Sequence, residues 1–235
     1  MSRKRMTKAM VSPHRIPRLA VLSLSLILLS AGLASQGRSQ NGPEAVEYLT
    51  KKPGDLIDVT KVNPRIVVDM KYATKDNLAK QALYDANVCF LRRSTALKLD
   101  AAQKELEGLN LGLKVWDCYR PLAVQHALWK ALPDERYVAN PRGGSRHNRG
   151  STVDATLVDS MGVELQMPTG FDDFSIRAHR HYRDLPEHVI RNRSLLETSM
   201  KKAGFIPLPR EWWHYDDEKW SDFEVMDVPF LKLLK

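Results

Sequence analysis

The sequence lacks several features that mark well-defined classes of protein. Its 235 residues contain no internal repeat, no long linker, no Gly-rich phosphate-binding loop and no nucleic-acid-binding motif. Beyond residue 34 they contain no apolar run approaching the roughly 20 residues that span a bilayer. These absences exclude repeat architectures and disfavour nucleotide-binding and membrane-spanning proteins. They leave one domain with one substantial core.

The chain beyond residue 34 also lacks a strong excess of positive or negative charge. The whole chain has 36 basic and 28 acidic residues and a net charge of +8. Six of the basic residues and none of the acids lie in residues 1–34, so the rest has 30 basic and 28 acidic residues, a net charge of +2. The basic residues are scattered among acids rather than banded. We therefore expect no nucleic-acid partner.

The first 34 residues have the composition of a secretory signal peptide. Residues 1–18 are basic, residues 19–34 are uncharged and mostly apolar, and Gly32-Leu33-Ala34 places small residues before a cleavage site. The apolar run of about 16 residues favours cleavage over an uncleaved membrane anchor, and no Cys follows it to carry a lipid. We expect a signal peptide over 1–34, a flexible leader over 35–45, a folded domain over 46–235, and export to the periplasm or the medium.

Only two cysteines occur, Cys89 and Cys118. In an exported domain two cysteines can pair, and a closed loop of about 30 residues would be stabilised by roughly 3–4 kcal/mol. The alternative is a pair of buried thiols that pack as small apolar side chains. A nucleophilic cysteine is the least favoured reading. Cys89 and Cys118 are therefore a candidate disulfide.

Helical and strand patterns alternate loosely along the domain. Helices are predicted from Ser94, as N-cap, to about Gly108, with Leu99, Ala102, Leu106 and Leu109 on one face, from Pro121 through Leu128, and over at least Asn192–Ala203. Strands are predicted at Ile57–Val59, Ile66–Met70, Leu113–Cys118, Ser151–Val158 and Trp212–Tyr215. We expect an α+β fold with a small, mainly antiparallel sheet and flanking helices, and irregular segments over 133–150 and 159–185.

Two histidines and two acidic residues are the candidates for a catalytic metal site. His147, Asp154 and His214 form the ligand set of an open zinc site, and Glu211 is a spare carboxylate beside the last imidazole. His147 and Asp154 are seven residues apart, so they would face opposite sides of one strand. If both bind one metal, His147 must lie in the loop before the strand. By the same reasoning Glu211 must lie at the bent start of the strand that carries His214.

Each of these residues also has an ordinary structural reading. A loop histidine is usually solvated, an acid in a strand is often a turn residue, and Trp212 and Trp213 are more typical of a core than of a substrate platform. Spacing alone leaves both readings open.

Four separated segments resemble the VanX-type zinc D-alanyl-D-alanine dipeptidases, which are related to zinc DD-carboxypeptidases. The segments are Asp69–Asn77, Trp116–Pro121, Ser145–Asp154 and Glu211–Tyr215. They occur in the family's order, and the resemblance covers roughly residues 50–220. Thr152 departs from the pattern, which usually has Ala there, but removes no ligand. The resemblance implies the zinc DD-peptidase fold, which is hedgehog-like, and a catalytic domain over 46–235.

The resemblance also implies roles for individual residues. His147, Asp154 and His214 match the ligands of one Zn²⁺, Glu211 matches the general base, and Arg120 matches the arginine that stabilises the oxyanion. The physical chemistry agrees, because zinc lowers the pKa of bound water to about 7 and a guanidinium stays charged beside a developing oxyanion.

A further group is expected to contact the substrate. Asp172, with Asp173 as its rival, is the candidate for the ammonium group of a dipeptide, and Ser145 and Tyr72 are candidates near its carboxylate or main chain. Asp117, three residues before Arg120, completes this group and could orient the guanidinium.

The sequence thus predicts zinc-dependent hydrolysis of the dipeptide D-Ala-D-Ala in peptidoglycan metabolism. The sequence leaves two alternatives open: a zinc DD-carboxypeptidase acting on stem peptides, and a non-catalytic, zinc-stabilised binding module of the envelope. The dipeptidase and the carboxypeptidase need the base Glu211, and the binding module does not. The sequence leaves the oligomeric state open.

Overall fold

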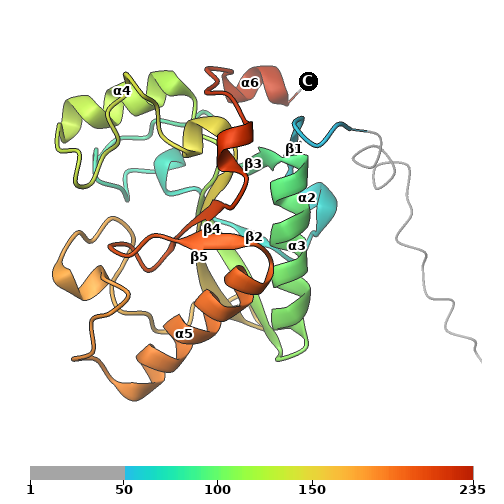
Figure 1. Cartoon of the computed structure of the whole chain (residues 1–235), viewed down its shortest axis with the longest axis vertical. Coiled ribbons are helices and arrows are strands. Elements are labelled where there is room, and N and C mark those ends of the chain that lie inside the picture. The colour runs from blue at the N-terminus through green and yellow to red at the C-terminus, as the bar shows by residue number, and fades with distance from the viewer. Residues whose placement is uncertain (1–50, 235) are drawn as a thin grey trace, which may run out of the picture. The chain divides into compact units, whose positions relative to one another are not determined.

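The computed structural model describes residues 51–234. The predicted signal peptide (1–34) and leader (35–45) lie outside these residues and stay predictions. Within the described part, no helix combines the length and apolarity that a bilayer span requires. The residues form an α+β domain, as predicted (Figure 1).

A five-stranded sheet forms the centre of the domain. Its order is β2-β4-β5-β7-β6, with β2 and β4 parallel and the other pairs antiparallel. Its strands are β2 (Val67–Val68), β4 (Leu111–Asp117), β5 (Thr152–Asp159), β6 (Phe205–Pro207) and β7 (His214–Asp217). A separate antiparallel pair joins β1 (Leu56–Asp58) to β3 (Phe90–Arg92). The sheet is small and mainly antiparallel, as the sequence predicted.

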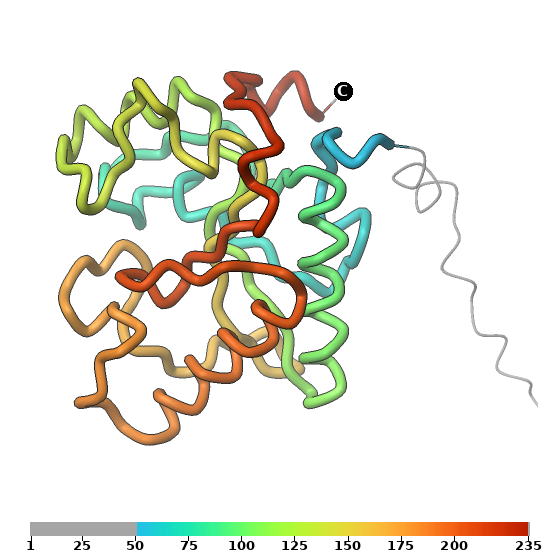
Figure 2. Tube along the Cα trace, in the orientation of Figure 1, coloured from blue at the N-terminus to red at the C-terminus, as the bar shows by residue number. Residues whose placement is uncertain are grey.

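Helices lie on both sides of this sheet. Figures 1 and 2 show α3 and α5 on one side, and α4 with long loops on the other. The helices are α2 (Val59–Val62), α3 (Arg93–Glu107), α4 (Leu122–Ala131), α5 (Glu187–Lys202) and α6 (Phe230–Leu233). Short 3-10 turns are η1 (Lys71–Ala73), η2 (His147–Arg149), η3 (Ile176–Ala178) and η4 (Trp220–Asp222).

Helix α3 forms where its apolar spacing predicts, but its ends differ. Leu99, Ala102 and Leu106 are buried on one face. Ser94 is not the N-cap; it lies inside the helix, and its hydroxyl donates to the Pro53 carbonyl. Leu109 follows the end of the helix and is 54% exposed, so it does not extend the apolar stripe. The sequence pattern therefore located the helix and missed its caps.

Helix α5 includes the predicted stretch from Asn192 and begins earlier, at Glu187, directly after Pro186, whose fixed φ suits a helix start. Two other boundaries differ from the predictions. Val59 opens α2 instead of ending a strand. Strand β7 begins at His214, so the buried tryptophans Trp212 and Trp213 precede it as core residues.

Cys89 and Cys118 are disulfide-bonded, with 5.4 Å between their Cα atoms. Both are fully buried. The bond ties the residue before β3 to the residue after β4, and so fixes one end of the strand that leads to Arg120.

Candidate metal centre and active site

The register of the sheet brings three polar side chains together. Asp117 on β4, Asp154 on β5 and His214 on β7 are directly paired across neighbouring strands, so they point to the same face. A β-bulge between Val115 and Asp117 makes this alignment possible, because a regular ladder would place Trp116 opposite Asp154.

His147 reaches the same place from outside the sheet. It lies in η2, just before β5, as the seven-residue spacing to Asp154 required. The chain passes from η2 into β5 through Gly150, which has φ of +70° and whose added Cβ would lie 2.7 Å from Leu56 Cδ2. Only glycine fits that turn.

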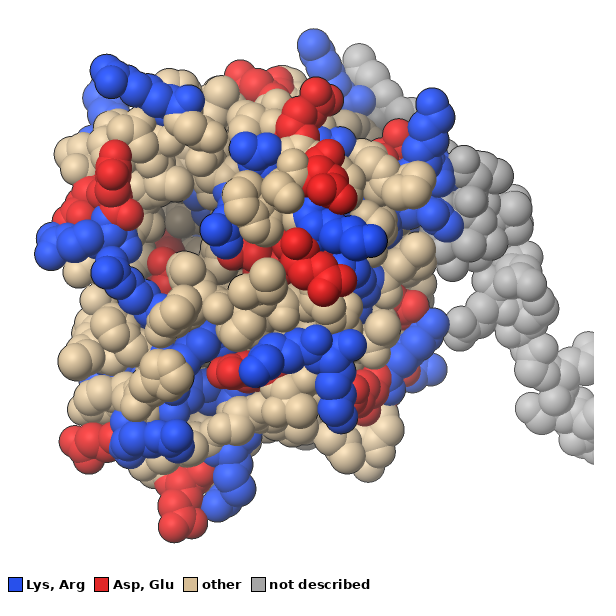
Figure 3. Space-filling model, viewed as in Figure 1, with Lys and Arg blue, Asp and Glu red and all other residues tan. Residues whose placement is uncertain are grey.

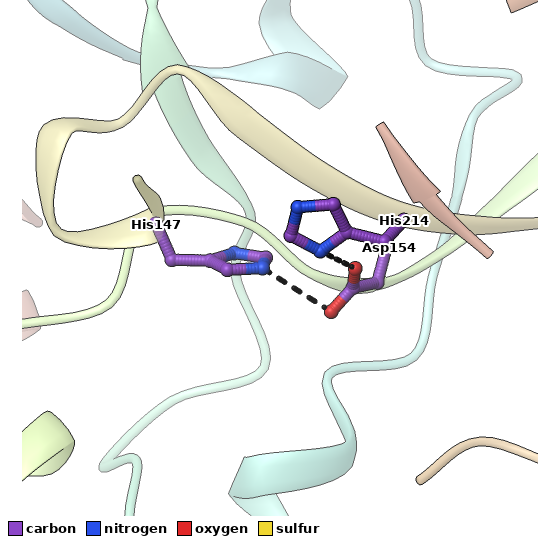
Figure 4. A group of neighbouring side chains, drawn as sticks. All are labelled: His147, Asp154 and His214. Carbon is purple, nitrogen blue, oxygen red and sulfur yellow. Dashed lines mark ion pairs between the residues drawn. The ribbon is translucent and has the colours of Figure 1, made fainter. Parts of the chain in front are cut away.

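The three predicted ligands form a compact group (Figure 4). Each of His147, Asp154 and His214 offers a ligand atom, and these atoms lie within 4.8 Å of one another. His147 Nε2 is 3.4 Å from Asp154 Oδ2, and His214 Nδ1 is 3.1 Å from Asp154 Oδ1. Two imidazoles and a carboxylate at this spacing match the three-ligand set of a catalytic metal site.

The bonding of these side chains fits a divalent metal. His147 Nδ1 donates to the Cys118 carbonyl at 2.8 Å, which leaves Nε2 with a free lone pair facing Asp154. The buried Asp154 Oδ1 accepts no hydrogen bond from the described residues. Although burial raises the pKa of Asp154, the two imidazoles outweigh it and hold the pKa below its ordinary value, so the carboxylate is ionised.

His214 lies between two carboxylates. Its Nδ1 faces Asp154, and its Nε2 lies 3.1 Å from Asp216 Oδ1. Burial alone lowers the pKa of His214, but the charges of Asp216 and Asp154 raise it well above its ordinary value. Asp216 was not among the residues that the sequence pattern predicted for the site. The available signal was strand alternation, because a residue two positions after His214 shares its face.

Glu211 lies at the approach to β7, as predicted. It is three residues before His214, and its Oε2 is 3.6 Å from His214 Nδ1. Burial raises the pKa of Glu211 above its ordinary value, although the His214 charge opposes the shift. A carboxylate with a raised pKa, placed beside a metal site, has the properties of a general base.

Arg120 is fixed by hydrogen bonds to buried side chains. Its guanidinium donates to Asp117 Oδ2 through Nε and Nη2, at 3.1 and 2.5 Å, and to Gln125 Oε1 at 2.7 Å. The Tyr84 hydroxyl donates to the other Asp117 oxygen. Burial alone lowers the pKa of Arg120, but the Asp117 charge raises it well above its ordinary value. Asp117 therefore orients Arg120, and it does not line the cavity as a substrate-binding residue.

Asp172 and Tyr72 form a hydrogen-bonded pair that lines the same cavity as Arg120. Asp172 Oδ2 accepts hydrogen bonds from the Tyr72 hydroxyl and the Leu78 N–H, both at 3.1 Å. Burial raises the pKa of Asp172 to about 7. Asp173, the alternative candidate from the sequence, instead accepts a hydrogen bond from the Ser175 N–H at 2.8 Å and does not line the cavity. Ser145 lies on the wall, and its hydroxyl accepts from the His147 N–H.

One cavity of 430 Å³ connects these groups. It is open to solvent, and a hollow on the left of the face in Figure 3 lies between the α4 side and the loops below it. Elsewhere on this face basic and acidic side chains are mixed. The predicted site residues that line the cavity are Tyr72, Arg120, Ser145, His147, Asp154, Asp172, Glu211 and His214.

Three candidate metal ligands, a neighbouring carboxylate and a buried arginine around one cavity are the groups that a metal-dependent hydrolase uses. Comparison with known proteins narrows this class. A family model described as D-Ala-D-Ala dipeptidase matches residues 52–231. The chain belongs to this family of metallopeptidases.

Curated relatives carry the same description. The D-alanyl-D-alanine dipeptidase of Escherichia coli K12 is 37% identical over 178 residues, which cover 75% of this chain and 91% of that protein. The corresponding proteins of Streptomyces coelicolor and Enterococcus faecalis are 34% and 32% identical, over 69% and 66% of this chain and 91% and 88% of their own lengths.

Proposed function

We propose that this chain is an exported zinc D-alanyl-D-alanine dipeptidase that acts on D-Ala-D-Ala in peptidoglycan metabolism. The observation that carries the proposal is the convergence of His147, Asp154, His214, Glu211 and Arg120 on one cavity. The names of the relatives supply the substrate class.

Zinc is the metal that the ligand set favours. Two imidazoles and one carboxylate suit Zn²⁺, and His147, Asp154 and His214 would hold it. When bound, zinc supplies Lewis acidity and lowers the pKa of water to about 7.

Glu211 moves the proton in this scheme. Its carboxylate faces the ligand group and has a raised pKa, so it can accept a proton from the attacking water and then return it to the amine that leaves. No hydrogen bond of the Glu211 side chain is described. A purely structural metal site would have no use for an acid in this position. This position favours an enzyme over a non-catalytic module.

Arg120 stabilises the charge that develops on the peptide oxygen. Because Asp117 and Gln125 fix its guanidinium, little reorganisation is needed as the negative charge forms. A positioned donor of this kind is worth about 10²–10³-fold in rate.

Asp172 binds the free ammonium group of the dipeptide. Its Oδ2 accepts hydrogen bonds from Tyr72 and Leu78, and the residue lines the same cavity as the candidate ligands. An ammonium group beside the ionised carboxylate would compensate the burial that raises its pKa. A DD-carboxypeptidase has an acylated substrate with no such cation, so this buried acid favours the dipeptidase.

Hydrolysis of matched substrates tests the proposal. The protein should cleave D-Ala-D-Ala, leave N-acetyl-D-Ala-D-Ala and L-Ala-L-Ala largely intact, and lose activity with a chelator and regain it with Zn²⁺. Equal rates on D-Ala-D-Ala and its N-acetyl form would favour the carboxypeptidase instead. Activity that survives complete metal removal would contradict the metal-dependent mechanism.

Export to an oxidising compartment is part of the proposal. The predicted signal peptide and the Cys89–Cys118 bond support it, because disulfides persist mainly outside the cytosol. Cell fractionation should find the chain outside the cytosol, cleaved near residue 34. Cytosolic protein with an intact N-terminus would refute it.

A further inference from the structure

A buried carboxylate outside the ligand set contacts one of the ligands. Asp216 is 1% exposed and lies two residues after His214 on β7. Its Oδ1 is 3.1 Å from His214 Nε2, so the second nitrogen of the imidazole is engaged. With that nitrogen donating to Asp216, His214 Nδ1 is the atom left to face Asp154 and the metal site.

Two side chains hold this carboxylate in place. Thr152 is directly opposite Asp216 in the β5–β7 register, is fully buried, and its hydroxyl donates to Asp216 Oδ1 at 2.8 Å. Arg146 pairs with the other oxygen, Oδ2, and its guanidinium stacks on the Trp220 ring, 4.3 Å from the centroid. Because a different side chain bonds each of the two oxygens, the carboxylate is restrained in its position against His214.

We propose that Thr152 and Arg146 are positioning residues, which hold Asp216 against His214 Nε2 and thereby set the affinity of the His147–Asp154–His214 site for zinc. This inference rests on the proposed function for the identity of the metal. A carboxylate behind a metal-binding imidazole fixes its tautomer and ring orientation and makes it a stronger ligand. Loss of such a partner typically lowers metal affinity by about 10–100-fold.

A matched pair of threonines makes the proposal testable. Thr152→Val keeps the shape of the side chain and removes its hydroxyl, and Thr152→Ser keeps the hydroxyl. Thr156 is the control: it lies on the same strand and face, is fully buried, and its hydroxyl has no hydrogen-bond partner among the described residues. The readout is zinc affinity, measured by competition with a chromophoric chelator on the folded chain.

The proposal predicts a graded result. Asp216→Asn should weaken zinc binding by about 10–100-fold and Thr152→Val by about 10-fold, the low end of the range for outer partners. Thr152→Ser should stay near the wild type, and so should Thr156→Val. With zinc at saturation, the KM of Thr152→Val for D-Ala-D-Ala should be unchanged, because the substrate contacts are intact.

Several outcomes would overturn the proposal. Equal zinc affinity of Thr152→Val and the wild type, or an equal loss in Thr156→Val, would reduce Thr152 to a packing residue. If Thr152→Val fails to fold, Arg146→Met addresses the other oxygen of Asp216 from a half-exposed position, and wild-type zinc affinity in that variant would refute the proposal. A wild type that binds no zinc would refute the proposed function itself, whereas a zinc-binding, active wild type with unaffected variants would refute this inference alone.

Discussion

Asp172→Asn should stabilise the metal-free chain while it abolishes dipeptide binding. The pKa of Asp172 is raised from 3.8 to about 7, chiefly by burial. The unfolded chain loses this proton near pH 4, whereas the folded chain keeps it until about pH 7. Stability therefore falls as pH rises between these values, and above pH 7 the ionised carboxylate costs a constant amount.

The size of this cost follows from the shift. A shift of about three units corresponds to about 4 kcal/mol at 1.36 kcal/mol per unit. The amide of Asn carries no charge, but one buried N–H without a partner costs about 1–3 kcal/mol. The net gain above pH 7 is thus about 1–3 kcal/mol. Asn also suits the backbone, because Asp172 has φ of +57°, in the left-handed region that Asn tolerates.

Urea unfolding of chelator-treated protein at pH 5 and pH 8 checks this reasoning. The advantage of Asp172→Asn over the wild type should be larger at pH 8 by roughly 2–3 kcal/mol, because the amide penalty is the same at both pH values and only the carboxylate titrates. Asp173→Asn is the matched control, since Asp173 caps a turn outside the cavity. An advantage that is equal at both pH values, or absent, would refute a strained, buried Asp172.

Three further predictions concern the metal, the arginine and the disulfide. Zinc affinity should fall by about tenfold per pH unit below neutrality. The pKa of His214 is raised well above its ordinary value, so its proton must leave before the metal binds. A zinc affinity that is independent of pH between 6 and 8, measured by chelator competition, would contradict this. Arg120→Lys should lower kcat by about 10²–10³-fold with zinc still bound, because an ammonium cannot reproduce the paired contacts to Asp117 and Gln125. Near-normal steady-state kinetics of this variant would rule out the oxyanion role of Arg120. Replacing Cys89 and Cys118 by Ser should lower the free energy of unfolding by about 3–4 kcal/mol in denaturant titrations, and equal stability of the variant and the oxidised wild type would argue against the bond.

The sequence alone predicted much of the site's geometry. Seven residues separate His147 from Asp154, and strand alternation then requires His147 to lie before the strand, where η2 places it. The same reasoning put Glu211 at the approach to the strand of His214. These predictions succeeded because local periodicity decides which face a side chain occupies.

Contacts between distant segments could not be predicted in this way. The Tyr84 hydroxyl reaches Asp117 only through the tertiary fold, and Tyr84 lies in no segment that suggested a role. The bulge at Trp116 shifts the register so that Asp117 lies beside Asp154, and no sequence pattern marked it. Strand β2 is likewise limited to Val67–Val68, shorter than the predicted run Ile66–Met70.

The residue Thr152 shows how a departure from a pattern gains meaning in a structure. In the sequence it was a substitution that removes no ligand. In the fold its hydroxyl reaches the Asp216 carboxylate behind His214, so the strand pairing of β5 and β7 links it to the metal site.

Glu211→Gln separates the role of Glu211 as the general base from any role in holding the metal. Gln keeps the size of the side chain and removes its basicity. The variant should bind one zinc per chain with near wild-type affinity, while its turnover of D-Ala-D-Ala falls by at least about 100-fold. Zinc binding with turnover close to that of the wild type would contradict the assignment of Glu211 as the base, and with it the mechanism proposed for this site.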